Sequence, residues 1–276
     1  MIKDLLWQSS DDFKDQVTKL IQNDVIDIDI REDIREDIDY NLLSQNSIDD
    51  DIMWALLYYS GYLTSQNDDH LRIPNKEVFI EWQGWIRKKS INQIKPDSML
   101  KTLLQGNLTK FGKELPKLIM KVLSYHDVQD NLVESNYHLF IVGLFSQAQF
   151  CGYKMMSNKE GGLGRFDLKI EPTEHADYLT SVIMEFKIIK NKNSDDDEYD
   201  PIDDYEETGP NEDEVECKLR KKAKEGLEQI SKNKYDSDIN SRSTKLVECG
   251  IAFQGKQTCV LSRVLRKERD QWVEDS

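Results

Sequence analysis

The sequence predicts an α/β protein with a mixed central sheet flanked by helices. Apolar residues at helical spacing dominate the chain up to about residue 150, whereas short alternating runs typical of strands dominate the part that follows. Two of those runs carry charges among apolar residues, namely Asp167 in the first and Glu185 and Lys187 in the second. Together these observations predict a sheet that holds a polar site.

The charged strands lie between Gly161 and Lys187, and the turn-rich segment between them predicts a hairpin. Residues two apart on a strand point to the same face, so Glu185 and Lys187 project together, and a suitable register places Asp167 beside them. Charges rarely enter a core without a partner or a metal. Two explanations remain open: a divalent cation held by the two carboxylates with the lysine beside it, or a structural cross-strand ion pair.

Composition limits the classes of protein to consider. The 276 residues suffice for one large domain or two small ones, and no apolar run reaches the length that spans a bilayer. The first residues lack the basic region of a secretory signal, and the four cysteines show no metal-type spacing. We therefore expect an intracellular protein, cytoplasmic or nuclear, with free thiols and no membrane partner.

The net charge of −15 argues at first against nucleic acid as a partner, but its distribution changes that interpretation. Residues 1–51 hold 5 Lys/Arg against 15 Asp/Glu, and residues 190–216 hold 2 against 13. The rest of the chain therefore carries +6. This mildly basic remainder gives weak support to a nucleic-acid substrate, since a solvated basic face is common in other proteins too.

The N-terminal third predicts two segments. An acidic segment over residues 1–47 begins with the pattern of an amphipathic helix. The order helix, hairpin, helix over residues 48–95 then resembles a winged helix, with Asp49 as the N-cap of its first helix and the hairpin at residues 62–73. A winged helix serves either to bind DNA or as a packing or lid module, and the acidic surroundings favour the second role.

Residues 96–276 predict the α/β domain itself. An apolar helix begins near Glu134 and holds His138, which we interpret as a core histidine. Residues 191–214 form an acidic, low-complexity insertion, interpreted either as a solvated loop or as a nucleic-acid mimic that occupies a basic groove. The remaining expected elements are helices within 90–130, a tight glycine loop at 161–164, a basic helix at 216–234, strands at 245–253 and 256–261, and a fraying charged tail.

Several of these segments, taken in order, resemble the PD-(D/E)XK nuclease superfamily. More closely, they resemble the nuclease domain found C-terminal to an AAA-ATPase-like domain in many proteins. The resemblance covers most of the chain from about Ile48. It rests on Leu71–Val78, Glu134–His138, the Ser157-Asn-Lys-Glu-x-Gly-x-Gly-Arg-Phe-Asp167 motif, Met184-Glu-Phe-Lys187, Leu227–Ile230 with Tyr235, and Gly250–Phe253.

This resemblance implies a restriction-endonuclease-like fold and a hydrolase that cuts phosphodiester bonds, with DNA as substrate. It implies that Asp167 and Glu185 bind Mg²⁺, or alternatively Mn²⁺, through oxygen, and that Glu134 reaches the metal directly or through water. Lys187 would orient or deprotonate the attacking water, and Gln229 would face the site. Glu134 could equally be a helix N-terminal carboxylate, and Gln229 an exposed amide.

Three further expectations accompany the resemblance. Arg165 either contacts phosphate or pairs with Glu160. Tyr235 follows Gln229 by six residues, whereas a glutamine in the superfamily's exonuclease-like branch is followed by tyrosine after four, so that pair is not transferred. The 276 residues contain no Walker A loop. The alternatives to a nuclease are therefore a non-catalytic interaction or regulatory module, and an accessory subunit that pairs with a separate AAA-type ATPase or another protein.

Overall fold

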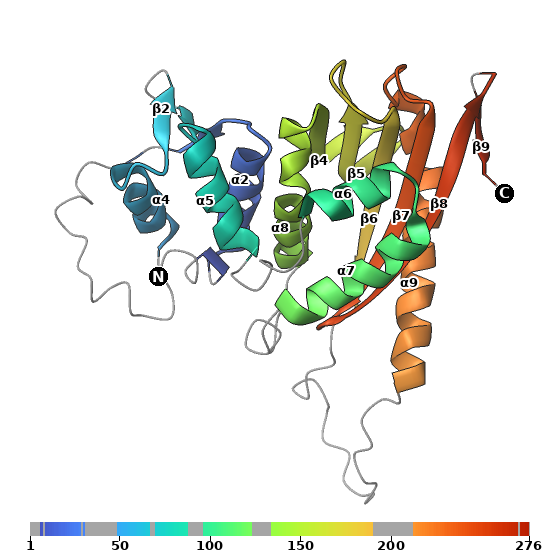
Figure 1. The fold of residues 1–276 in the computed structure, drawn as a ribbon. Helices are drawn as coiled ribbons and strands as arrows, with labels where there is room; N and C mark the ends of the chain where they lie inside the picture. The colour runs from blue at the N-terminus through green and yellow to red at the C-terminus, as the bar shows by residue number, and fades with distance from the viewer. Residues whose placement is uncertain are drawn as a thin grey trace, which may run out of the picture. The chain divides into compact units, whose positions relative to one another are not determined.

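The computed structural model describes residues 6–7, 9–28, 30, 49–66, 70–87, 96–122, 134–189, 212–269 and 271–275. Its contacts divide the chain into two compact units, drawn as one ribbon in Figure 1. The first unit comprises Met1–Pro96 with Val133–Phe150, and the second comprises Asp97–Leu132 with Cys151–Ser276. The chain therefore passes between the units three times. The predicted segments 1–47, 48–95 and 96–276 are contiguous and follow a different division.

The first unit combines helices with one small antiparallel sheet of order β1-β3-β2. Ser10 accepts a hydrogen bond from the Phe13 amide, and Asp49 accepts one from the Asp51 amide, so a capping side chain begins α2 and α4 as expected for these residue types. The elements are α2 (Asp11–Ile21), β1 (Ile26–Asp27), α4 (Asp50–Tyr59), β2 (Thr64–Gln66), β3 (His70–Arg72), α5 (Lys76–Arg87), α8 (Glu134–Phe145) and the 3₁₀ helix η3 (Ser146–Phe150). The predicted hairpin at residues 62–73 is confirmed as β2 and β3.

Helix α8 is the core of the first unit. Every residue from Ser135 to Phe145 is buried, and the helix packs against α2 and α5. A Cβ at Gly143 would collide with the side chain of Ile86, so the glycine permits the close approach of α8 and α5. His138 is buried within this helix, in agreement with the interpretation as a core histidine.

The second unit is built on a six-stranded sheet of order β4-β5-β6-β7-β8-β9. Only β6 and β7 run parallel, so the sheet is mixed and the predicted α/β class is confirmed. The strands are β4 (Tyr153–Gly161), β5 (Gly164–Pro172), β6 (Thr180–Ile188), β7 (Lys245–Gln254), β8 (Gln257–Glu268) and β9 (Gln271–Glu274). The helices are α6 (Pro96–Leu104), α7 (Leu108–Val122), α9 (Glu212–Lys232) and the 3₁₀ helix η4 (Tyr235–Asp238).

Helices cover both faces of this sheet. On strand β8, Cys259 and Leu261 pack toward α9, whereas a Cβ at Gly106, just after α6, would meet Val264. Successive residues of a strand point to opposite faces, so α9 lies on one face and α6 and α7 on the other. Helix α9 forms the crossover that a parallel pair such as β6 and β7 requires.

The close packing of α9 on the sheet depends on two glycines. A Cβ at Gly250 in β7 would collide with the carbonyl oxygen of Ala223 and lie 2.8 Å from the Leu227 amide nitrogen. A Cβ at Gly226 in α9 would lie 3.2 Å from the Gly250 Cα and 3.5 Å from the Glu185 Cβ. The helix backbone therefore lies directly over the strand positions that carry the predicted site.

Two expectations for loops and ends require correction. The charged C-terminal tail does not fray: β8 continues to Glu268, β9 pairs with it, and Arg266 forms an ion pair with Asp275 at 2.7 Å. Residues 212–214, assigned to the acidic insertion, lie within α9, while residues 191–211 of that insertion lie outside the described residues. No helix among the described ranges combines the length and hydropathy that a membrane span requires.

Candidate functional site

The first site residue, Asp167, occupies the position where β5 separates from its neighbours. The β5–β6 ladder pairs Leu168 with Met184, and one further step sets Asp167 opposite Glu185, where no backbone pairing continues. Instead, the amide of Phe186 donates a hydrogen bond of 2.6 Å to Asp167 Oδ2. The Asp167 carboxylate thus accepts a hydrogen bond from a strand amide beyond the end of the β5–β6 ladder, and this contact fixes the position of the carboxylate.

The other side of β5 is also irregular at this point. The β4–β5 ladder pairs Ser157 with Leu168 and Lys159 with Phe166 but omits Asn158, which would face Asp167. Asn158 has φ +52°, in the left-handed region that asparagine tolerates better than most residues. Such local distortions of a ladder often occur beside active sites, where they re-aim a side chain.

Glu185 is the most deeply buried charged group of the site. It is 1% exposed, and its Oε1 has no hydrogen-bond partner among the described residues. Its Oε2 lies 3.7 Å from Lys187 Nζ. Burial raises the pKa of Glu185 far above its usual range, and the neighbouring Asp167 carboxyl raises it further, while Lys187 and the Tyr235 hydroxyl oppose the shift.

Lys187 connects the sheet to helix α9. Its Nζ donates a hydrogen bond of 2.7 Å to Gln229 Oε1, which is shorter than its 3.7 Å separation from Glu185. The side chain is 25% exposed, so its ammonium lies at the boundary between the buried Glu185 carboxylate and solvent. Gln229 therefore contacts Lys187, on the side that the resemblance implied, and its role in the site stays a prediction.

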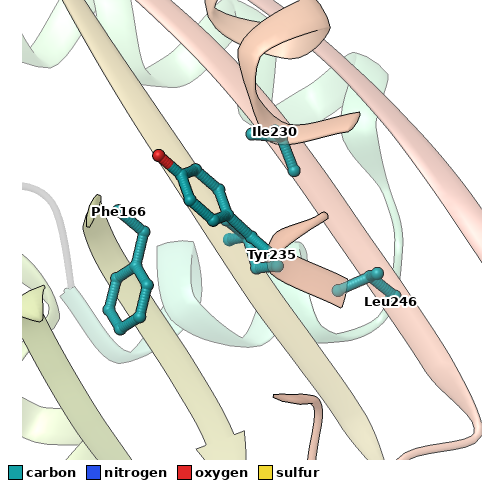
Figure 2. Packing of buried hydrophobic residues seen from close by; sticks show 5 residues of the cluster. Phe166, Ile230, Tyr235 and Leu246 are labelled. Carbon is teal, nitrogen blue, oxygen red and sulfur yellow. The ribbon is translucent and has the colours of Figure 1, made fainter. Parts of the chain in front are cut away.

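Tyr235 is a member of this cluster that the sequence reasoning left unassigned. Its ring is fully buried between Phe166 and Ile230, as Figure 2 shows, and belongs to the apolar cluster beneath α9. Its hydroxyl donates to the Arg165 carbonyl oxygen at 2.7 Å and accepts from Asn233 Nδ2 at 2.8 Å. The hydroxyl also acts on the pKa of Glu185, which places it at the site.

The loop that carries Tyr235 is held by the β4–β5 turn. The amide of Leu163 donates to the Asn233 carbonyl oxygen at 2.7 Å, and the amide of Gly162 donates to Asp238 Oδ2 at 2.9 Å. A Cβ at Gly162, which has φ +54°, would collide with the carbonyl oxygens of Asn233 and Lys234. The predicted tight glycine loop is confirmed, and it has the further effect of fixing η4.

The other two predicted residues stand apart from this cluster. Glu134 is exposed at the start of α8, which belongs to the first unit, so its approach to a metal stays a prediction. Arg165 is exposed beside the β4–β5 turn and is paired in register with Glu160. In the described part of the chain, no three His, Cys, Asp or Glu side chains gather as a metal-binding group.

A cross-strand ion pair accounts for the cluster incompletely. The Lys187 ammonium lies 3.7 Å from Glu185 Oε2 but makes its shorter contact, 2.7 Å, with the Gln229 amide. One buried oxygen of Glu185 has no donor among the residues that the structure describes. Like charges at short range disfavour ionisation unless a cation compensates them, and two carboxylate oxygens are suitable ligands for Mg²⁺. The donor set around Asp167 and Glu185 therefore fits a divalent cation.

Comparison with known proteins yields one match. A protein-family model described as the PD-(D/E)XK nuclease superfamily matches residues 132–263. This span includes all the predicted site residues from Glu134 to Gln229 and also Tyr235. Searches of curated proteins and of solved structures find no match.

Proposed function

We propose, because a family model of the PD-(D/E)XK nuclease superfamily matches residues 132–263, that the chain is a Mg²⁺-dependent nuclease that hydrolyses phosphodiester bonds of DNA. The superfamily suggests nuclease activity and the use of a divalent metal. The observation that supports the proposal most is the buried Glu185, which faces Asp167 and keeps one oxygen without a donor among the described residues.

The proposed roles follow from what each side chain contacts. Asp167, held by the Phe186 amide, and Glu185 would hold the cation, and Glu134 would be a further ligand. A bound Mg²⁺ supplies polarisation of the scissile phosphate and a lowered pKa for a water molecule. Lys187, oriented by Gln229, would align the attacking water or stabilise negative charge on the phosphate.

The finer parts of the proposal have separate support. The choice of Mg²⁺ over softer metals follows from a donor set made of carboxylate oxygens, and Mn²⁺ is the natural substitute. The choice of nucleic acid is consistent with the +6 carried by the chain outside its two acidic segments. Arg165, exposed beside the turn, is the proposed phosphate contact on the substrate side.

A nuclease assay with Mg²⁺ or Mn²⁺ tests this function. We expect wild type to cut linear or circular DNA, and Asp167→Ala and Lys187→Ala to lose at least 100-fold in rate, since removing one transition-state donor typically costs ~10²–10³. The control is Lys154→Ala, which removes an exposed lysine of β4 in the same sheet.

Equal cleavage by all four proteins would attribute the activity to a contaminant and reject the site. DNA binding without cleavage in either metal would instead identify the catalytically inactive alternative. If RNA were cut faster than DNA, the proposed metal centre would stand, and RNA would replace DNA as the proposed substrate.

A further inference from the structure

A basic groove lies on the flank of α9 opposite the proposed metal centre. It encloses about 800 Å³ between α9 and β8, with Glu274 of β9 at its outer edge. Gln229 and Gly226 face the strand that carries Glu185, whereas the groove is lined from α9 by residues at positions 217, 220, 221, 224, 227, 228 and 231. The two sites therefore share one helix, about 10 Å in diameter, and use different sides of it.

The cations of the groove differ in how far they are already neutralised. Arg263 is paired with the buried Glu248 through two contacts of 2.5 and 2.6 Å, and Lys224 lies 3.6 Å from Glu228. Arg220 and Lys221 are exposed and have no carboxylate within 4 Å among the described residues. These two side chains are thus available to bind an anion.

The remainder of the lining suits a ligand that is both anionic and partly apolar. Leu227 and Leu261 form an apolar part of the wall, and the hydroxyls of Ser231 and Ser262 lie beside it. Ser231 is held in place because its Oγ accepts a hydrogen bond of 2.5 Å from Arg263. Phosphates match the free cations, while sugars and base faces match the apolar wall.

We propose that this groove binds the phosphodiester backbone of a nucleic-acid strand as it leaves the metal centre. The inference rests on the proposed function, because it assigns a second contact surface to the same substrate. Because the two sites lie on different sides of one helix, the cleaved bond and the groove would contact phosphates only a few nucleotides apart. Arg220 and Lys221 would contact the phosphates directly.

Equilibrium binding in EDTA tests the groove without any cleavage. The probe is a fluorescent single-stranded oligonucleotide, and anisotropy is measured from 50 to 200 mM salt. The double variant Arg220→Ala/Lys221→Ala should bind at least 10-fold more weakly at 50 mM salt. The slope of a plot of the log of the binding constant against the log of the salt concentration should be smaller in magnitude by about 1.4, because each phosphate contact on a single strand contributes ~0.7. The matched control is Lys218→Ala/Lys232→Ala, which removes two exposed lysines of the same helix that do not line the groove.

Cysteine alkylation gives an independent readout of occupancy. Cys217 lines the groove and is exposed, and Cys151 is exposed outside it and serves as the internal control. The oligonucleotide should slow alkylation of Cys217 and leave Cys151 unchanged.

Equal affinities and slopes in both double variants, or a Cys217 that the oligonucleotide does not protect, would overturn the proposal. The proposal would also be overturned if Cys217 reacted only after deletion of residues 193–209. That result would mean that the acidic segment of the full chain occupies the groove. Binding is measured without metal, so failure of the groove is distinguishable from failure of the nuclease, which the Lys187→Ala assay reports.

Discussion

At the residue scale, Glu185 is carried into the sheet by its neighbours. Every residue of β6 from Thr180 to Phe186 is buried, so a carboxylate at position 185 enters the core with its strand. Burial of a carboxylate that is poorly compensated costs several kcal/mol, and this desolvation, together with the neighbouring Asp167, raises the pKa of Glu185 despite the nearby Lys187. A functional cation is the compensation that the arrangement supports.

Glu185→Gln should stabilise the metal-free protein while abolishing cleavage. The amide keeps the shape and is neutral without taking up a proton on folding, so the free energy of unfolding at pH 8 should rise by about 1–3 kcal/mol, the scale of a poorly paired buried polar group. The folded pKa of Glu185 lies above the unfolded value, so the folded wild type binds more protons, and its stability relative to the variant should fall as pH rises above about 4.3.

Urea unfolding in EDTA at pH 5 and pH 8 measures this difference. Addition of Mg²⁺ should raise the free energy of unfolding of the wild type relative to the variant at pH 8, since a ligand present at 100 times its Kd adds about 2.7 kcal/mol to the wild type only. If the free energy of unfolding depended on pH identically in the two proteins, the pKa of Glu185 would not be raised in the folded state.

At the element scale, helix α9 organises the site. One flank brings Gln229 to Lys187, and the chain that follows the helix returns through η4 so that Tyr235 reaches Glu185. This arrangement needs α9 to lie directly on the sheet, which the absence of a side chain at Gly250 permits. The geometry of Lys187 thus depends on a glycine of the neighbouring strand, which is the register partner of Glu185.

Gly250→Ala should therefore lower both stability and activity. The added methyl group would push against the Ala223 carbonyl, and such overpacking typically costs about 1–3 kcal/mol. Gly112→Ala in α7 is the control, because its Cβ would come no nearer than 4.0 Å to Val260 and alanine favours a helix. Chemical denaturation should show a loss in the first variant and a small gain in the second. An unchanged Gly250→Ala protein would mean that α9 can shift without cost.

At the scale of the whole molecule, the boundaries of the family match differ from the boundaries of the two compact units. The match begins at residue 132 and so includes α8, yet the contacts of α8 are with α2 and α5 of the first unit. Ser135 donates to Asp11 at 2.6 Å, and Gln83 donates to Ser146 at 2.5 Å within the same unit. The segment before residue 97 therefore supplies packing for a helix that lies within the span matched by the family model.

A chain that starts at Asp97 should be poorly soluble even though it keeps every predicted site residue. Removal of α2 and α5 would expose α8, whose residues from Ser135 to Phe145 are all buried in the full chain. We expect aggregation in size-exclusion chromatography and strong binding of a hydrophobic dye, and rescue when residues 1–96 are supplied as a separate chain. A monodisperse fragment that binds no dye would show that α8 needs no cover from the first unit.

The sequence by itself determined the α/β class, the hairpin with Asp167, Glu185 and Lys187, and the helix that carries Gln229, because strand alternation and helical spacing are local properties. Only the tertiary structure decided that β5 separates from β6 at Asp167, that one oxygen of Glu185 has no described partner, and that Tyr235 returns to the site. Register, burial and crossover packing depend on residues far apart in the chain, so no local pattern encodes them. The groove beside α9 has the same origin, since β8 and β9 supply its second wall.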